Sequence, residues 1–278
     1  MGVPHGAAPA DRGLYDAPMS TDRLREIWAG GGVVINAWLT LEGTSAASVL
    51  SAAGFDSVTL DLQHGAATAP DAAEIVASIE QAGSVPLARP AWNEPAGLMR
   101  LLDVGARGLI CPMVSTREEA ERFVGACRYP PLGERSYGPV RGSLGAGAEH
   151  VRRSNETVLA FAMIETADGF ANLDEIAATP GLDGLHVGPA DLSLALGLST
   201  FADLTDPELL RALDEVVAAA TRHGIVAGVH APSPERAIEM AARGFRFVTA
   251  AADADLLGRA AVDALTRTRA GLESTSKS

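Results

Sequence analysis

Lysine is almost absent from this chain, because the one lysine among its 278 residues is Lys277, next to the last residue. Aldol or decarboxylation chemistry through a Schiff base needs a lysine amine inside a pocket, where the loss of water activates it. A lysine at position 277 does not fit that role. Schiff-base catalysis and attachment of pyridoxal phosphate are therefore excluded, and carbanion chemistry would have to depend on a metal ion.

Other signatures of catalysis and targeting are missing as well. The sequence has no Gly-x-Ser-x-Gly motif, no Walker loop and no His-Glu-x-x-His pair, so hydrolase and nucleotide-transfer functions lose their usual support. The two cysteines, Cys111 and Cys127, have neither metal-type spacing nor a redox motif, and we expect reduced residues in or near the core. No apolar run is long enough to span a bilayer, and the first residues lack a signal-peptide layout, so we expect a cytoplasmic protein without a membrane partner.

Acidic residues outnumber basic ones by 35 to 22, which gives a net charge of −13 and a pI near 4.9. This balance argues against nucleic acid or an anionic membrane as a partner. A hydrophobic content of 47% and a charged content of 21% are typical of a globular protein with an ample core. No linker divides the chain, so we expect one domain over residues 21–270, with disordered tails at 1–20 and 271–278.

Short β-rich runs alternate with amphipathic segments, which predicts parallel βα units. A doubly wound open sheet is the alternative, but its first strand usually precedes a Gly-rich dinucleotide turn, whereas Leu39-Thr-Leu-Glu-Gly43 follows here. Eight βα units of this total length fit a TIM barrel, an α/β fold. The expected strands are Val33–Trp38, Ser57–Asp61, Val85–Arg89, Gly108–Val114, Val158–Ile164, Gly184–Val187, Ile225–Val229 and Phe245–Ala250. The expected helices are Thr44–Ala53, Ala72–Ala82, Glu94–Asp103, Arg117–Cys127, Gly169–Ala178, Pro207–His223, Pro234–Arg243 and about Asp255 to Thr268.

In a TIM barrel, catalytic residues gather at the C-terminal ends of the strands. Glu165 and Asp191 follow two neighbouring strands, and their oxygens are the hard ligands that magnesium and manganese prefer. The alternative is a pair of loop acids that cap the next helices. The Gly188-Pro-Ala-Asp191 turn opens a helical segment, whose backbone N–H groups can bind a carboxylate. Other side chains at strand ends are Trp38, Asp61, His64, Arg89 and His230.

Each of these other side chains also has a structural interpretation. Arg89, which precedes Pro90, can be an ion-pair partner, and His64 can cap a loop. Trp38 can be a large core aromatic, and His230 can cap the loop after its strand. What favours a functional interpretation is their grouping, because random placement would scatter polar groups over both ends of the barrel.

Several motifs occur in a characteristic order between about residue 22 and residue 268. They are Ala53-Gly-Phe-Asp56, Asp61-Leu-Gln-His64, Ala88-Arg-Pro-Ala-Trp-Asn93, Leu102-Asp-Val-Gly-Ala106, Cys111-Pro-Met-Val114, Arg128-Tyr-Pro-Pro131, Ile164-Glu165 and Gly188-Pro-Ala-Asp-Leu-Ser193. Together they resemble the class II pyruvate aldolases of the HpcH/HpaI family, which includes 4-hydroxy-2-oxoheptanedioate aldolase.

The resemblance implies roles for individual residues. Glu165 and Asp191 would ligate a divalent cation, Mg²⁺, Mn²⁺ or Co²⁺, and Arg89 would stabilise the enolate of pyruvate. His64 would act as general acid and base, oriented by Asp103 as first choice or by Asp61 as second. The substrate-binding residues would be Trp38, Gln63, Gly188, Pro189, Ala190 and His230.

Three positions depart from the family pattern. Gln63 stands where relatives often have glutamate, Met163 where several have glutamine, and His230 where several have an aliphatic residue. The proton path, the hydrogen bonds around the metal and the choice of aldehyde are therefore expected to differ. The resemblance also implies a homo-oligomer, a hexamer or trimer, in which the last helix packs on a neighbouring subunit.

We therefore expect a metal-dependent lyase that reversibly cleaves 4-hydroxy-2-oxo acids to pyruvate, or a close 2-oxo acid, and an aldehyde. One alternative is a related barrel that acts on a CoA thioester or an oxaloacetate-derived enolate. The scarcity of basic residues other than arginine argues against the CoA thioester. Another is a barrel that binds a 2-oxo acid without turning it over. The joint presence of His64, Arg89, Glu165 and Asp191 argues against that alternative.

Overall fold

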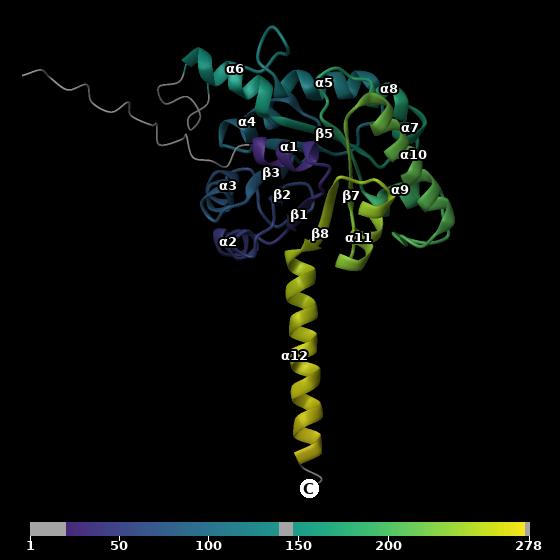
Figure 1. Cartoon of the computed structure of the whole chain (residues 1–278). Helices are drawn as coiled ribbons and strands as arrows, with labels where there is room; N and C mark the ends of the chain where they lie inside the picture. Colours follow the sequence, from purple (N-terminus) through teal and green to yellow (C-terminus); the bar gives the residue numbers. More distant parts are fainter. Residues whose placement is uncertain (1–20, 139–146, 276–278) are drawn as a thin grey trace, which may run out of the picture.

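The computed structural model describes residues 21–138 and 147–275, and its eight parallel strands close into a barrel in sequence order (Figure 1). Each strand pairs with the next along the chain, and the eighth pairs with the first. The expected TIM barrel is confirmed, and the open sheet is excluded. The strands are β1 (Val34–Leu39), β2 (Ser57–Asp61), β3 (Val85–Arg89), β4 (Gly108–Cys111), β5 (Leu159–Ile164), β6 (Gly184–Val187), β7 (Val226–His230) and β8 (Phe247–Ala252).

Helices connect the strands on the outside of the barrel, and local signals fix their ends. The Asp206 carboxylate accepts from the N–H groups of Glu208 and Leu209 at the start of α10, and Gly224 ends that helix with a φ of 67°. The helices are α1 (Asp22–Ala29), α2 (Thr44–Ala52), α3 (Ala72–Gln81), α4 (Pro95–Asp103), α5 (Arg117–Cys127), α6 (Gly147–Thr157), α7 (Ala167–Ala171), α8 (Leu173–Ala177), α9 (Pro189–Ala195), α10 (Pro207–His223), α11 (Pro234–Arg243) and α12 (Asp253–Thr275).

A few element boundaries differ from those expected. β4 ends at Cys111 instead of Val114, because Pro112 has no N–H to donate and Met113 has a φ of 59°. One helix was expected over Gly169–Ala178, but α7 and α8 are separate helices that meet at Asn172. α1 and α6 were not expected.

The interior of the barrel contains both an apolar cluster and a buried polar group, in which the Asn36 amide oxygen accepts from Ser57 and Thr59. Side chains of alternate residues point inward, since successive residues of a strand face opposite sides. Leu24 and Trp28 of α1 pack against the inner apolar cluster, and the Trp28 indole donates to the carbonyl of Arg246. This helix closes the N-terminal end of the barrel. A ligand site is therefore expected at the C-terminal ends.

The last helix, α12, leaves the barrel and projects from it (Figure 1). Its first residue is held in place, because the Asp253 carboxylate accepts from the backbone N–H groups of Thr40 and Leu41. After Asp253 every described residue of the helix is exposed. The helix reaches Thr275, so the tail expected over 271–278 is wrong for 271–275, while 1–20 and 276–278 lie outside the described residues. In the described part of the chain, none of the helices has the length and apolar content that a membrane span requires.

Candidate active site

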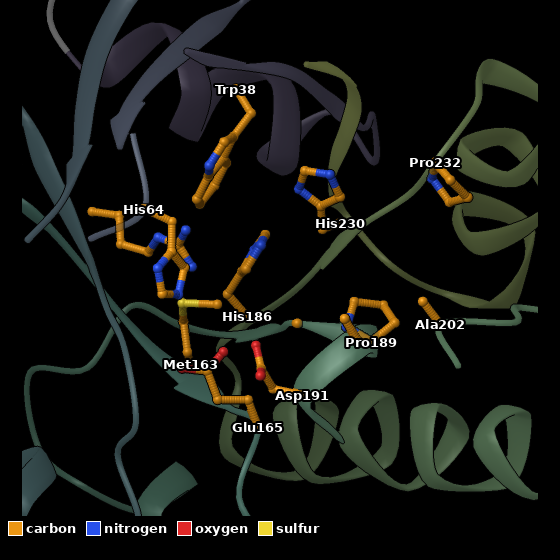
Figure 2. A pocket seen from close by; sticks show the side chains of 13 residues that line it. Trp38, His64, Met163, Glu165, His186, Pro189, Asp191, Ala202, His230 and Pro232 are labelled. Carbon is orange, nitrogen blue, oxygen red and sulfur yellow. The ribbon is translucent and has the colours of Figure 1, made fainter. Parts of the chain in front are cut away.

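A cavity of about 230 Å³ lies at the C-terminal ends of the strands (Figure 2). Most of the predicted site residues line it, and they come from different strands and loops. The predicted residues in its wall are Trp38, His64, Arg89, Glu165, Gly188, Pro189, Ala190, Asp191 and His230. The wall also contains Met163, His186, Ala202 and Pro232, which were not predicted as site residues.

Glu165 and Asp191 bring two carboxylates to one small space. Glu165 directly follows β5 and is 3% exposed, and Asp191 lies in the first turn of α9. A Cβ atom placed on Gly188 would lie 2.8 Å from Glu165 Oε2 and 3.9 Å from Asp191 Oδ2. The absent side chain of Gly188 thus leaves room between the two carboxylates, which lie close together in Figure 2.

The two carboxylates fit a divalent cation. Glu165 Oε2 is buried and has no hydrogen-bond partner among the described residues. Burial raises the pKa of Glu165 to about 7, the Met113 N–H opposes this shift, and the negative charge of Asp191 adds to it. A cation between the carboxylates would stabilise the ionised form of Glu165 against burial and against the charge of Asp191. The described residues contain no group of three or more His, Cys, Asp or Glu suited to a metal, so Glu165 and Asp191 would leave other coordination positions to water or a ligand.

The Cys111-Pro-Met-Val114 motif supports Glu165 from the loop after β4. The N–H of Met113 donates to Glu165 Oε1 at 2.7 Å. Met113 has a φ of 59°, a left-handed conformation that costs a residue with a side chain about 1–2 kcal/mol. Ser115 Oγ and Thr166 Oγ1, 2.8 Å apart, connect the same loop to the residue after Glu165. The loop therefore fixes one oxygen of Glu165 and leaves the other free.

Arg89 and Asp61 form a buried ion pair at the ends of β3 and β2, where the sheet register places them side by side. Arg89 Nε lies 2.8 Å from Asp61 Oδ1, and Arg89 Nη2 lies 2.5 Å from Asp61 Oδ2. The Trp38 indole also donates to Asp61, and its ring lies 5.1 Å from the Arg89 guanidinium carbon. Burial alone would raise the pKa of Asp61, but the hydrogen bonds and charge of Arg89 outweigh it and the pKa is lowered. Asp61 is thus buried next to the cavity without lining it, and it holds the Arg89 guanidinium in place.

The loop after β2 carries His64, an exposed residue, into the wall of the cavity. The backbone N–H groups of Gln63 and His64 donate to Asp61 Oδ1 at 3.0 and 3.3 Å. Asp61, the second choice as partner of His64, therefore contacts its backbone. Gln63 was expected to bind substrate, but it is not among the residues of the cavity wall.

The structure does not bring Asp103, the first choice as partner of His64, to the pocket. Asp103 is the last residue of α4, and its carboxylate accepts from Arg135 at 2.9 Å. A helix after a barrel strand runs back toward the N-terminal ends of the strands, so its last residue lies far from the C-terminal ends. The predicted contact between Asp103 and His64 is therefore not made within the described chain.

Two more histidines pack around Trp38. His230, the last residue of β7, meets the Trp38 ring edge-on at a centroid distance of 5.5 Å, and burial lowers the pKa of His230 to about 4. A neutral ring at pH 7 favours hydrogen bonding over the pairing of a protonated His230 with a carboxylate. His186 in β6 stacks on Trp38 at 5.8 Å. His186 lies within a strand and was not predicted to be a site residue, although its two-residue spacing from Gly188 places both on the inner face.

Comparisons with known proteins show which family the chain resembles. A family model described as HpcH/HpaI aldolase/citrate lyase matches residues 35–260. The chain is 39% identical over 249 residues to a hydroxypyruvate/pyruvate aldolase of Rhizorhabdus wittichii. This alignment covers 90% of the present chain and 99% of the relative. The chain is also 33% identical over 234 residues to a 5-keto-4-deoxy-D-glucarate aldolase of Shigella dysenteriae. That alignment covers 84% of the present chain and 91% of the relative.

Solved structures share the fold. A HpcH/HpaI aldolase/citrate lyase family protein from Burkholderia cenocepacia has a TM-score of 0.80 and 33% identity, and the match covers 90% of this chain and 100% of that chain. The citrate lyase beta subunit of M. tuberculosis, solved with oxaloacetate and magnesium, has a TM-score of 0.53 and 17% identity, with 80% and 93% covered. The second likeness concerns the fold alone.

Proposed function

The chain belongs to the HpcH/HpaI aldolase/citrate lyase family of carbon–carbon lyases, and we propose that it is a divalent-metal-dependent aldolase. Its substrates are 4-hydroxy-2-oxo acids, which it reversibly cleaves to an aldehyde and a small 2-oxo acid, pyruvate or hydroxypyruvate. The observation that carries the proposal is the pair of carboxylates, Glu165 and Asp191, that meet over Gly188. The name of the R. wittichii relative supports the choice of 2-oxo acid.

Glu165 and Asp191 would hold the cation, Mg²⁺, Mn²⁺ or Co²⁺, which when bound acts as a Lewis acid toward a keto group. Arg89 places a second positive charge in the same pocket, and Asp61 fixes its direction through two hydrogen bonds. A preorganised charge at the oxygen where negative charge develops lowers such barriers by about 3 kcal/mol. The Trp38 ring packs beside the Arg89 guanidinium, 5.1 Å from its central carbon.

His64 handles the proton. Cleavage requires a base for the 4-hydroxyl group, and an imidazole suits this role near neutral pH. His64 is exposed and lines the cavity, which an aldehyde enters and leaves, and Asp61 holds its backbone. Gly188, Pro189 and Ala190 line the wall beside Asp191, where free backbone N–H groups at the start of α9 can bind the carboxylate of the 2-oxo acid.

A coupled assay for pyruvate release from 4-hydroxy-2-oxo acids tests the proposal. We expect release that stops with EDTA, returns with excess Mg²⁺ or Mn²⁺, and persists after treatment with borohydride, because no pocket lysine forms a Schiff base. Activity that EDTA leaves unchanged would contradict the metal dependence. Failure to release pyruvate from any 4-hydroxy-2-oxo acid would contradict the aldolase.

We also propose that the protein is a homo-oligomer in which α12 packs on a neighbouring subunit. In a regular βα barrel the last helix covers the outside between the first and the last strand. Here α12 projects away, and its apolar residues Leu256, Leu257, Val262, Leu265 and Leu272 are 43–67% exposed. Val49 on α2 and Ile238 on α11, helices that contact β1 and β8, are exposed as well.

Light scattering after gel filtration tests the oligomer. We expect Leu257→Glu combined with Leu265→Glu to lower the molecular mass toward that of one chain, because the charges cannot be buried in an interface. Ala270→Glu, on another side of the helix, serves as the control and should keep the wild-type mass. A wild-type protein of one-chain mass would contradict the proposal.

A further inference from the structure

His186 is a buried polar side chain that no described residue of the protein satisfies. The residue is 0% exposed, and neither ring nitrogen has a hydrogen-bond partner among the described residues. Buried polar groups in folded proteins are nearly always hydrogen-bonded. Because His186 lines the cavity at the C-terminal ends, the missing partner is expected to come from what the cavity holds.

Apolar surfaces fix the imidazole without competing for its nitrogens. One face stacks on Trp38, with ring centroids 5.8 Å apart and an angle of 15°, and Phe247 meets the ring edge-on at 5.7 Å. A Cβ atom on Gly228, its neighbour across the sheet, would lie 2.8 Å from His186 Nδ1. The ring thus occupies the room that this glycine leaves, and Figure 2 shows it between Met163 and His230.

Depth separates His186 from the other histidines. Gly188 lies two residues beyond His186, about 6.6 Å further toward the open end. His230 likewise lies two residues beyond Gly228, the register partner of His186. His186 is therefore at the floor of the cavity, beneath the carboxylates that flank Gly188. His230 lies one layer nearer the mouth, where an aldehyde would approach.

The floor offers a neutral group that can both donate and accept. Burial holds the pKa of His186 well below its ordinary value, and the positive charge of Arg89 contributes, so the ring is neutral near pH 7. A neutral imidazole has one N–H donor and one acceptor nitrogen, which match the hydrogen-bonding groups of an alcohol. The cavity-lining neighbours Trp38 and Met163 belong to the apolar cluster and suit a methyl group but not a hydroxyl group.

We propose that His186 contacts a hydroxyl group on the third carbon of the donor 2-oxo acid, and so determines how well the site takes 3-hydroxy-2-oxo acids relative to pyruvate. The inference rests on the proposed aldolase function and deepens it by naming a residue that selects the donor. Its effect is independent of the aldehyde, because His186 lies below the level at which the aldehyde approaches.

Two variants at this position separate hydrogen bonding from packing. His186→Phe keeps a ring between Trp38 and Phe247 but has no polar atom, and His186→Gln keeps a donor and an acceptor. We would measure kcat/KM for hydroxypyruvate and for pyruvate with one common aldehyde. Calorimetric titration of each acid into Mg²⁺-loaded protein without aldehyde gives affinities that do not depend on turnover. His223→Phe, a substitution on the surface of α10, is the control, and thermal unfolding shows which variants are folded.

We expect His186→Phe to lower the hydroxypyruvate-to-pyruvate ratio of kcat/KM about 10- to 100-fold, the effect of losing one buried hydrogen bond. The affinity for hydroxypyruvate should fall in parallel, that for pyruvate should stay within about threefold, and His186→Gln should restore part of the ratio.

Equal losses for both acids in folded His186→Phe and His186→Gln would overturn the assignment, as would a wild-type protein that binds pyruvate but not hydroxypyruvate. If the wild type cleaves no 4-hydroxy-2-oxo acid, the proposed function fails. The titrations still decide the role of His186. A loss of affinity for hydroxypyruvate alone in His186→Phe supports the role, whereas unchanged affinities, or no binding of either acid to the wild type, refute it.

Discussion

Replacement of Asp61 by asparagine tests the buried ion pair that holds Arg89. The substitution keeps the shape of the side chain but removes its charge, and it leaves a guanidinium that is 10% exposed without that partner. Removal of one member of a buried pair costs about 3–5 kcal/mol, because the other charge stays buried. In a protein of this size each kcal/mol shifts the melting temperature by about 2–4 °C, so we expect Asp61→Asn to lower Tm by about 6–20 °C.

The pH dependence of this loss has a definite sign. The pKa of Asp61 is lowered in the folded protein, because the Arg89 interactions outweigh the opposing effect of burial. A carboxyl group of this kind stabilises the fold above its unfolded pKa of about 3.9, and the stabilisation is lost as the pH falls through the folded pKa. The difference between wild type and Asp61→Asn should therefore be constant from about pH 5 to 8 and shrink below about pH 4.

Thermal and urea unfolding at fixed protein concentration measure this difference. Asp214→Asn is the matched control, because Asp214 also binds an arginine, Arg243, with both oxygens but is 53% exposed. The exposed pair is worth about 1 kcal/mol or less. If Asp61→Asn cost no more than Asp214→Asn, or if the difference changed between pH 5 and 8, the argument for a buried and charged pair would be refuted.

The remaining predictions concern catalysis. His64→Ala should lower aldol cleavage by about 10²–10⁴-fold and oxaloacetate decarboxylation less, because only the former needs proton transfer at the aldehyde oxygen, and equal losses would show that its role is wrong. Arg89→Ala should lower both reactions, and unchanged decarboxylation would contradict its role at the developing negative charge. His230→Leu should shift the kcat/KM ratio toward apolar aldehydes by about 1–3 kcal/mol with little effect on decarboxylation, whereas unchanged ratios would leave His230 a structural residue.

The fold could be predicted from the sequence because each strand is a short apolar run bounded by turn residues. The bounds of β2, β3 and β6 agree with those expected. The end of β4 was predicted three residues too late, since apolar character continues through Val114 while Pro112 cannot take part in strand pairing. The projection of α12 from its own barrel has no local signal, because an apolar helix face can pack equally on its own barrel or on another.

The candidate site could be predicted only in part. Residues at strand ends, such as Glu165 and Arg89, were recognised because the fold collects these positions around one cavity. Asp103 lies away from the cavity of its own chain, and similarity of motifs says nothing of the end of the barrel at which α4 terminates. His186 was missed within a strand, and the contact from Met113 involves a backbone N–H, for which side-chain chemistry gives no signal.

The central claim is that Glu165 and Asp191 hold a catalytic divalent cation. Calorimetric titration of Mn²⁺ or Mg²⁺ into wild type, Glu165→Gln and Asp191→Asn, with pyruvate release measured on the same samples, tests this claim most directly. Glu156→Gln, at an exposed glutamate of α6, is the control. We predict that either site variant folds, loses metal affinity by about 100-fold or more and releases no pyruvate, while the control behaves as wild type. A Glu165→Gln protein with wild-type metal affinity and metal-dependent pyruvate release would contradict the account.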